Sequence, residues 1–463
     1  MLENLLKNKK IENLVKFFDS YYYPLFLFGV VLLTHCFALD IIGFIITVLC
    51  FFLTTVLCED LRPSIPFILM FPYVVSTQNS PGYGFSEYYA SPTILGILFA
   101  LGILIILAFV LRTILRKEYK TFFDFKNKKL LLGFLLLIPC YSLAGIFSGW
   151  LDFNSVVVSI IMIILQPIIY LLFSSGMRSK EDNLLYFSKC SALAILLMAL
   201  EIAFVYVLKY TWGTPLNSIW KMHIIVGSVV SNSAGEFIVI LFPFLFYAAQ
   251  KEKRGYIYYI LASLSLIATY FTLSRAALLF VVPTYVIGTI LLCFKGINKK
   301  LFRIISCLYI CVIVVALIVI CATGHSEGFF EFFRKVGLSS RVRFKIWSEI
   351  YEKFINYPIF GVGFSTYMQT TPNIDHIFKG LAHNTAVQIL CSTGIVGTLL
   401  FLYHTFEVVK LFIKKLSINL LVYAVVIVLF VGISMLDQTY FFPNFTILYT
   451  LFLIMAEKET AKI

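Results

Sequence analysis

The stretch PTILGILFALGILIILAFVL, residues 92–111, decides the fold of this 463-residue chain. It carries no charged residue, and about 20 mostly apolar residues are enough for a helix to cross a lipid bilayer. Similar apolar runs recur along the sequence, and they are continuous, without the alternation of a barrel strand. They therefore exclude a β-barrel and predict membrane-spanning helices.

The composition supports the same class of protein. Apolar residues make up 60% of the chain, charged residues 13%, and the mean hydropathy is +0.93, whereas soluble domains contain roughly 25% charged residues. We expect an all-α polytopic membrane protein with about 14 transmembrane helices. The predicted spans lie near 21–39, 41–58, 63–76, 92–111, 130–149, 155–174, 190–211, 233–250, 257–274, 276–294, 304–322, 384–404, 419–436 and 440–456.

The positive charges predict the orientation of these spans. The net charge is +13, but most Lys and Arg residues fall in alternate loops, as expected of cytoplasmic loops. This explains the basicity without nucleic acid as a partner. We expect a cytoplasmic amphipathic N-terminus at 1–20, spans 1–11 within 21–322, a long external loop at 323–382, spans 12–14 within 383–456 and a cytoplasmic tail at 457–463.

The predicted external loop contains seven basic residues, against the usual bias. An external site for an anionic ligand would explain them, although long loops also translocate regardless of charge. Within the loop, we expect a short helix at 327–337 ended by Gly337, and a second at 341–356, capped by Ser339 or Ser340 and ended by Tyr357 and Pro358. The seven are Arg334, Lys335, Arg341, Arg343, Lys345, Lys353 and Lys379.

Arg343 is the loop arginine that shares a helix face with the apolar residues Trp347 and Ile350. A guanidinium in that setting needs an anionic partner, and a diphosphate offers a bidentate one. The alternative is an interfacial helix whose arginines reach lipid headgroups.

A second arginine, Arg275, interrupts an apolar stretch at the predicted external boundary, where an ionisable residue indicates function or a side chain reaching for the interface. Glu201 and Glu236 lie at similar depth in spans seven and eight. The sequence does not separate their roles.

The predicted return to the membrane begins with His383 and Asn384. The partial positive charge of a helix N-terminus favours a neutral imidazole, which can accept a proton. His383 is therefore the candidate general base. No zinc-binding histidine spacing is present, and we expect no metal and no cofactor.

Together these motifs resemble the O-antigen ligase and polymerase family, the Wzy/WaaL type of membrane glycosyltransferase. The resemblance covers about residues 230–405, and the first 220 residues match only as generic spans. The motifs, in order, are Ser274-Arg275-Ala276, Arg343-x-x-x-Trp347, Pro358-x-x-Gly361-x-Gly363 and His383-Asn384-x9-Gly394-x-x-Gly397.

The resemblance implies a GT-C-type fold in the cytoplasmic (inner) membrane, with an active site on the external or periplasmic face. It implies an undecaprenyl-diphosphate-linked oligosaccharide as donor and inversion without a metal. Carried over, Arg275 and Arg343 become the diphosphate clamp, with Arg341 as the alternative to Arg343, and His383 becomes the base. Supporting positions are Asn384, Ser274, Trp347, Gly361 and Gly363.

Three activities remain open. A polymerase would join lipid-linked repeat units for an O-antigen or capsule polysaccharide, and we favour it because of the span number and a composition typical of low-GC bacteria. A ligase would move a finished glycan to lipid A core or protein. A polysaccharide or lipid-glycan transporter should show two related halves, which the sequence lacks. Expected partners are the lipid-linked glycan and membrane lipids, with room for a chain-length regulator.

Overall fold

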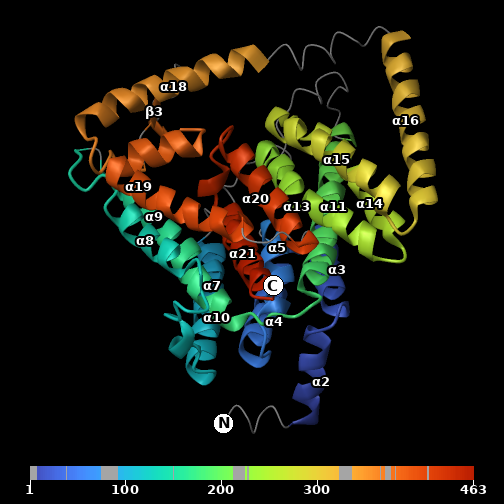
Figure 1. The fold of residues 1–463 in the computed structure, drawn as a ribbon, viewed down its shortest axis with the longest axis horizontal. Coiled ribbons are helices and arrows are strands. Elements are labelled where there is room, and N and C mark those ends of the chain that lie inside the picture. The colour runs from blue at the N-terminus through green and yellow to red at the C-terminus, as the bar shows by residue number, and fades with distance from the viewer. Residues whose placement is uncertain are drawn as a thin grey trace.

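The computed structural model describes residues 8–37, 39–74, 92–149, 151–211, 225–226, 229–322, 336–364, 367–370, 377–380, 382–413 and 417–462. Within these residues the chain is helical apart from two short antiparallel hairpins (Figure 1). The hairpins pair β1 (Ile225–Val226) with β2 (Val229–Val230) and β3 (Tyr367–Thr370) with β4 (Ile377–Gly380).

Each predicted apolar run contains a helix. The first half of the chain forms α2 (Lys9–Phe18), α3 (Tyr22–Cys36), α4 (Asp40–Leu57), η1 (Arg62–Ser64), α5 (Ile65–Val74), α7 (Pro92–Leu115), η2 (Glu118–Thr121), α8 (Leu131–Ser142), α9 (Phe153–Ile163), η3 (Ile164–Ile168), α10 (Ile169–Gly176) and α11 (Asn183–Thr211). The second half forms α13 (Ser231–Lys251), α14 (Gly255–Phe271), α15 (Arg275–Lys295), α16 (Lys299–Ala322), α18 (Val336–Asn356), α19 (Thr385–Ile413), α20 (Ile418–Ser434), η4 (Thr439–Phe441) and α21 (Pro443–Thr460).

The prediction of a polytopic helical membrane protein is confirmed, but the predicted number of spans is confirmed only in part. Seven of the described helices, counting α9 to α10 as one, are long and apolar enough to cross a bilayer, or eight if the bent pair α2 and α3 forms one span. Some apolar runs form short helices. The runs at 63–76 and 130–149 give helices of 10 and 12 residues, whereas a perpendicular crossing needs about 20.

Helix α13 forms the centre of the molecule. Nearly all of its residues are buried, and it packs against α11, α14, α15 and α20. At its N-terminal end, Gly235 allows close approach of the turn before α15, because an added Cβ would lie 2.8 Å from both the Thr272 hydroxyl and the Ala277 Cβ. This contact places the start of α15 beside the first turns of α13.

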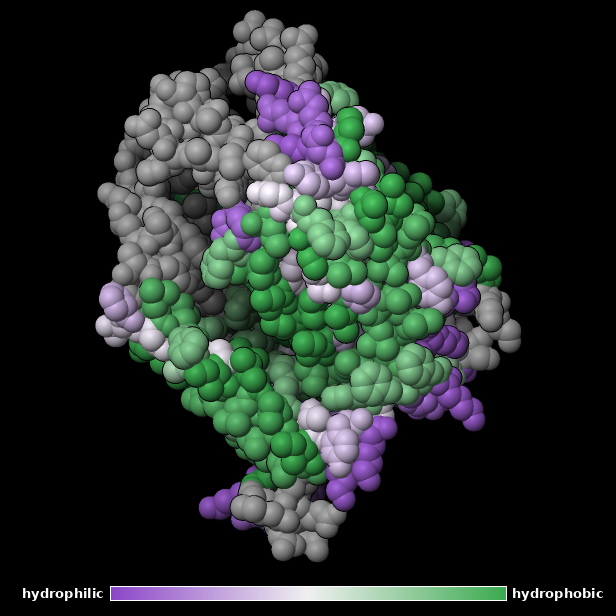
Figure 2. Space-filling view, turned by 90° about the vertical axis from the view of Figure 1, so that its left-hand side faces the viewer, coloured by the Kyte–Doolittle hydropathy of each residue, from purple (hydrophilic) through white to green (hydrophobic). Residues whose placement is uncertain are grey.

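The surface has the polarity expected of a membrane protein. On the face drawn in Figure 2, hydrophobic residues form a broad area, and most hydrophilic residues gather toward the ends of the molecule. In Figure 1, α18 lies at one end and α2 at the other. The described part of the predicted external loop therefore lies far from the N-terminal helix.

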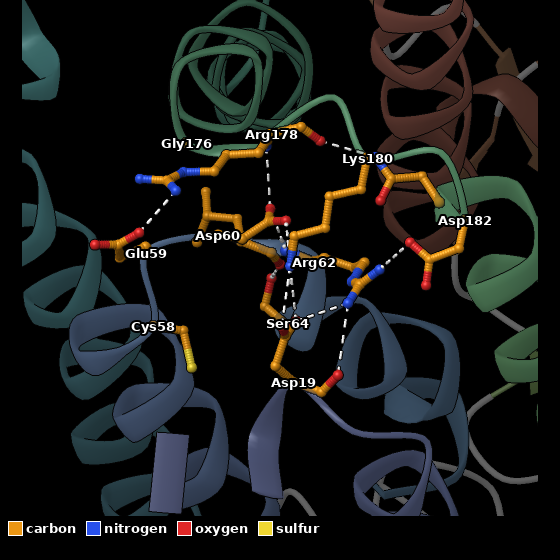
Figure 3. A network of polar contacts seen from close by, with 12 residues as sticks. Asp19, Cys58, Glu59, Asp60, Arg62, Ser64, Gly176, Arg178, Lys180 and Asp182 are labelled. Carbon is orange, nitrogen blue, oxygen red and sulfur yellow. Dashed lines mark hydrogen bonds and ion pairs between the residues drawn. The ribbon is translucent and has the colours of Figure 1, made fainter. Parts of the chain in front are cut away.

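At the end of the molecule near α2, a polar network ties several loops together (Figure 3). Arg62 forms ion pairs with Asp19 at 2.8 Å and with Asp182 at 2.7 Å, and Lys180 pairs with Asp19 at 2.9 Å. These contacts join the α2–α3 turn, η1 and the segment before α11. Here the buried arginine has carboxylate partners within the protein, so the network is structural.

Candidate active site

His383 lies just before α19 and has a left-handed backbone, with φ of +50°. Its Nδ1 is 3.0 Å from Oδ1 of Asp437, which lies between α20 and η4. A carboxylate only accepts hydrogen bonds, so a neutral imidazole in this pair carries its hydrogen on Nδ1. The side chain of His383 is 42% exposed. Its Nε2 therefore remains a proton acceptor at the surface of the site.

Asp437 is a residue of the site that the sequence did not single out. It is buried, and its Oδ1 also accepts the backbone N–H of Gln438 at 2.8 Å. Burial raises the pKa of Asp437, but the hydrogen bond and charge of His383, the Gln438 N–H and the charge of Arg343 lower it further, so the net pKa falls below the usual 3.8. The available signal was a single acidic residue between two apolar runs on the predicted external side.

Asn384 fixes His383 against this carboxylate. Its Oδ1 accepts the Val387 N–H at 3.0 Å, which caps α19, and its Nδ2 donates to the Met435 carbonyl at 2.7 Å. The first turn of α19 is thereby tied to the end of α20. The two residues of the predicted re-entry motif thus form one unit, with His383 exposed and Asn384 anchored.

Helix α18 is attached to the same place through Trp347. The indole Nε1 donates to the Ala382 carbonyl at 2.8 Å, one residue before His383. Around this bond, α18 and the start of α19 share an apolar cluster. Its members are Ile346, Ile350, Phe354, Ala382 and Cys391, with Trp347, Val387 and Leu390 packed against them.

Arg343, one helical turn before Trp347, is brought toward the His383 unit by this attachment. Its guanidinium is close enough to interact electrostatically with Asp437, with Glu236 and with Arg275. No ion pair of Arg343 is formed within the described residues. The side chain of Arg341 lies outside the described residues, so its role as the alternative to Arg343 stays a prediction.

Arg275 is the first residue of α15. Ser274 caps this helix by accepting the Ala277 N–H at 3.3 Å, and Leu273 before it has φ of +57°. The Nη1 atom of Arg275 is buried and has no hydrogen-bond partner among the described residues. Arg275 and Arg343 thus offer two neighbouring guanidinium groups, one of which has an unsatisfied buried nitrogen. An anion that accepts two hydrogen bonds would suit this arrangement.

Gly361 and Gly363 form a turn that packs against α19. Both have positive φ, +69° and +86°. The N–H groups of Val362 and Gly363 donate to the Cys391 and Ser392 carbonyls, at 2.9 and 3.0 Å. They thus hold the turn against α19 beside its kink at Gly394, where φ is +69°. At this turn the backbone comes close to the backbone of α19, so the two glycines serve a contact within the protein.

The structure separates the two buried glutamates that the sequence left equivalent. Glu201, on α11, lies 3.2 Å from Nε2 of His35, whose Nδ1 is 3.1 Å from Asp40. Glu236, on α13, accepts the Thr439 hydroxyl at 2.9 Å and interacts with Asp437 and Arg343. Only Glu236 therefore belongs to the site.

The loop helices differ from the prediction. Helix α18 runs without a break from Val336 to Asn356, so Gly337 does not end a helix and Ser339 and Ser340 do not begin one. Its second half, from Ile346 to Phe354, packs against the start of α19. The predicted end before Tyr357 and Pro358 is confirmed. Most of the predicted helix at 327–337 lies outside the described residues.

Several polar atoms of the site are unsatisfied. Each is buried and lacks a hydrogen-bond partner among the described residues, although more than nine in ten buried polar groups usually have one. A polar ligand bound at the site would supply such partners. Those on or beside the site are Arg275 Nη1, Glu236 Oε1, Thr385 Oγ1, Ser434 Oγ and Gln438 Oε1.

Comparison with known proteins identifies one region. Residues 260–402 match the Wzy_C family model, which is described as O-antigen ligase. The match includes Arg275, Arg343 and His383, whereas Glu236 and Asp437 lie outside it. No curated protein matches the chain.

Proposed function

We propose that this chain, in which residues 260–402 form a Wzy_C domain of the O-antigen ligase type, is a polymerase of lipid-linked oligosaccharide repeat units for a bacterial surface polysaccharide. Proteins of the Wzy_C family are membrane enzymes of surface polysaccharide synthesis. The observation that carries the proposal is the contact of His383 with Asp437 beside Arg275 and Arg343, for which the described residues supply no ion-pair partner.

We propose that Arg275 and Arg343 hold the donor diphosphate. Two guanidinium groups near each other repel, and an anion between them removes that repulsion while accepting several N–H bonds. The unsatisfied Nη1 of Arg275 supports this role. As the glycosyl–oxygen bond breaks, negative charge grows on the diphosphate, and fixed cations stabilise that change most strongly.

His383 would then act as the general base. Its Nε2 takes the proton of the acceptor hydroxyl, while the hydroxyl oxygen forms a bond to the anomeric carbon of the donor sugar. The bond from that carbon to the diphosphate oxygen breaks at the same time, and undecaprenyl diphosphate leaves with the electron pair. Asp437 accepts a hydrogen bond from the Nδ1–H group, and its negative charge stabilises the imidazolium that forms.

Ligase activity is the second candidate, because the matching family is described as O-antigen ligase. The choice between the two depends on the acceptor, which is another lipid-linked repeat unit for a polymerase and a different molecule for a ligase. Our preference for polymerase rests on composition and resemblance. The seven or eight candidate spans of the described residues do not add to it.

The test is reconstitution of the purified protein in liposomes with undecaprenyl-diphosphate repeat units. We expect a ladder of products that differ by one repeat unit. A single transfer to added lipid A core or acceptor protein, without a ladder, would establish the ligase instead. Absence of any new glycosidic bond with either acceptor, from protein that remains folded, would contradict both.

A further inference from the structure

The carboxyl groups of Glu236 and Asp437 lie near each other beside His383. Glu236 projects from the second turn of α13 and is fully buried, and Asp437, from the segment between α20 and η4, is buried as well. The two groups interact electrostatically, and the Thr439 hydroxyl that Glu236 accepts lies two residues after Asp437. The proposed mechanism uses Asp437 and leaves Glu236 without a task.

The partners of the two groups differ. Oδ1 of Asp437 faces the His383 ring and a backbone N–H, and the charge of Arg343 adds to its stabilisation as an anion. Among the described residues, Glu236 has one hydrogen-bond donor, the uncharged Thr439 hydroxyl. Two carboxyl groups in contact away from water do not both ionise, and the group with weaker partners keeps the proton. The proton of this pair therefore belongs to Glu236.

The hydrogen bonds also indicate which oxygen carries that proton. Oε2 of Glu236 accepts the Thr439 hydroxyl, while Oε1 is buried with no hydrogen-bond partner among the described residues. On Asp437, Oδ1 accepts both of the hydrogen bonds that the described residues donate to this carboxylate. A proton on Oε1 of Glu236 directed at the Asp437 carboxylate would satisfy the buried oxygen that is otherwise left alone.

We propose that Glu236 is a positioning residue that works in its protonated form, donating a hydrogen bond to the carboxylate of Asp437 and so holding that carboxylate against His383. The inference rests on the proposed function of His383 as the base. It makes a chain from Thr439 through Glu236 and Asp437 to the imidazole, in which each group fixes the next.

The protonated form also suits the donor. Arg343 interacts with both carboxyl groups, and an ionised Glu236 would add a second negative charge near this guanidinium. That charge would compete with the diphosphate for Arg343. A neutral Glu236 leaves Asp437 as the single anion among the charged groups described around it. The charged and titratable groups described around Glu236 are Asp437, His383, Arg343 on α18, and Arg275 at the start of α15, the helix that packs on Gly235.

The test compares Glu236→Gln, Glu236→Met and Glu236→Ala in the reconstituted transfer assay. Gln is neutral and donates a hydrogen bond, Met has similar length without a donor, and Ala leaves a cavity. We expect Gln to retain activity within about threefold of the unaltered protein and Met and Ala to lose at least about tenfold in kcat, the size of one lost buried hydrogen bond. Glu201→Gln is the matched control, because Glu201 is also buried and pairs with His35 instead of with Asp437.

The pH profile supplies a readout that packing alone would not move. Ionisation of Glu236 at alkaline pH should reduce kcat of the unaltered protein, and Glu236→Gln should abolish this loss, since the amide does not ionise. A Gln variant as inactive as Ala, or an unchanged alkaline loss in it, would overturn the inference. Retained activity in His383→Ala would instead overturn the proposed function, so the two failures are distinguishable.

Discussion

At the scale of the residue, the arginines and glutamates of the site differ from those elsewhere in the partners that the protein gives them. Arg62, in the structural network, forms two ion pairs, at 2.7 and 2.8 Å, whereas Arg275 forms none with the described residues and has a buried Nη1 without a hydrogen-bond partner among them. An arginine whose charge is paired within the protein stabilises the fold, and one without such a carboxylate is the better candidate for binding an anion. The same contrast separates Glu201, beside His35, from Glu236, beside Asp437.

The clamp assigned to Arg275 makes a prediction about geometry. Arg275→Ala should reduce kcat/KM for the lipid-linked donor by about 10²-fold, the usual effect of removing one group that stabilises a developing anion. Arg275→Lys should be nearly as damaging, because lysine is a point charge and does not form a bidentate pair. Steady-state transfer assays would measure both. Full activity in the Lys variant would show that charge alone is enough.

Asp437 makes a prediction with a defined pH range. Its lowered pKa means that its contribution is present above pH 3.8 and is lost as the pH falls through that lowered pKa. The contact with His383 is therefore intact from about pH 5 to neutral pH. Asp437→Asn should lower kcat by at least about 10²-fold across this range. Activity equal to that of the unaltered protein at any pH in the range would exclude the orienting role.

At the scale of the element, helices α18 and α19 meet beside His383. Some of their boundaries can be predicted from the sequence and others cannot. The end of α18 before Pro358 was predictable, since proline disfavours a helical residue before it. Its start was not, because α18 begins at Val336 and continues through Gly337, a residue that usually disfavours a helix interior. The kink of α19 at Gly394 depends on bonds to a segment about 30 residues earlier, which no local pattern encodes.

The kink gives a prediction about stability. Gly394 has φ of +69°, and a Cβ there would lie 2.5 Å from the Gly361 nitrogen. Gly394→Ala should therefore destabilise the protein, since the left-handed backbone alone costs roughly 1–2 kcal/mol. A thermal scan in detergent should show a lower midpoint. The control is Gly102→Ala in α7, where no atom lies within 4 Å of the added Cβ; equal midpoints for the two variants would contradict the account.

At the scale of the whole molecule, hydropathy predicted the class and the positions of the helices, while the number of crossings needed the structure. Apolar residues fill short buried helices such as α8 as readily as long spans, because a large core and a bilayer both select them. The arginine motifs and His383 were predictable because ionisable residues stand out in apolar sequence. Asp437 was missed because it reaches the site only through the packing of α20 against α19.

The orientation is a further prediction for the whole molecule. If most Lys and Arg residues mark cytoplasmic loops, epitope tags at both termini should be detected only after cells are permeabilised. A tag placed in segment 323–335 should be detected on intact spheroplasts. Detection of a terminal tag from outside, in protein that still transfers glycan, would require a different arrangement of spans.

The central claim is that His383 removes the proton of the acceptor hydroxyl. It is tested most directly by His383→Ala in the reconstituted transfer assay, with Arg275→Ala measured alongside and donor binding measured separately. We predict that His383→Ala inserts normally and binds the lipid-linked donor, yet forms no glycosidic bond, while Arg275→Ala weakens donor binding. Transfer by His383→Ala at a rate near that of the unaltered protein would contradict the account.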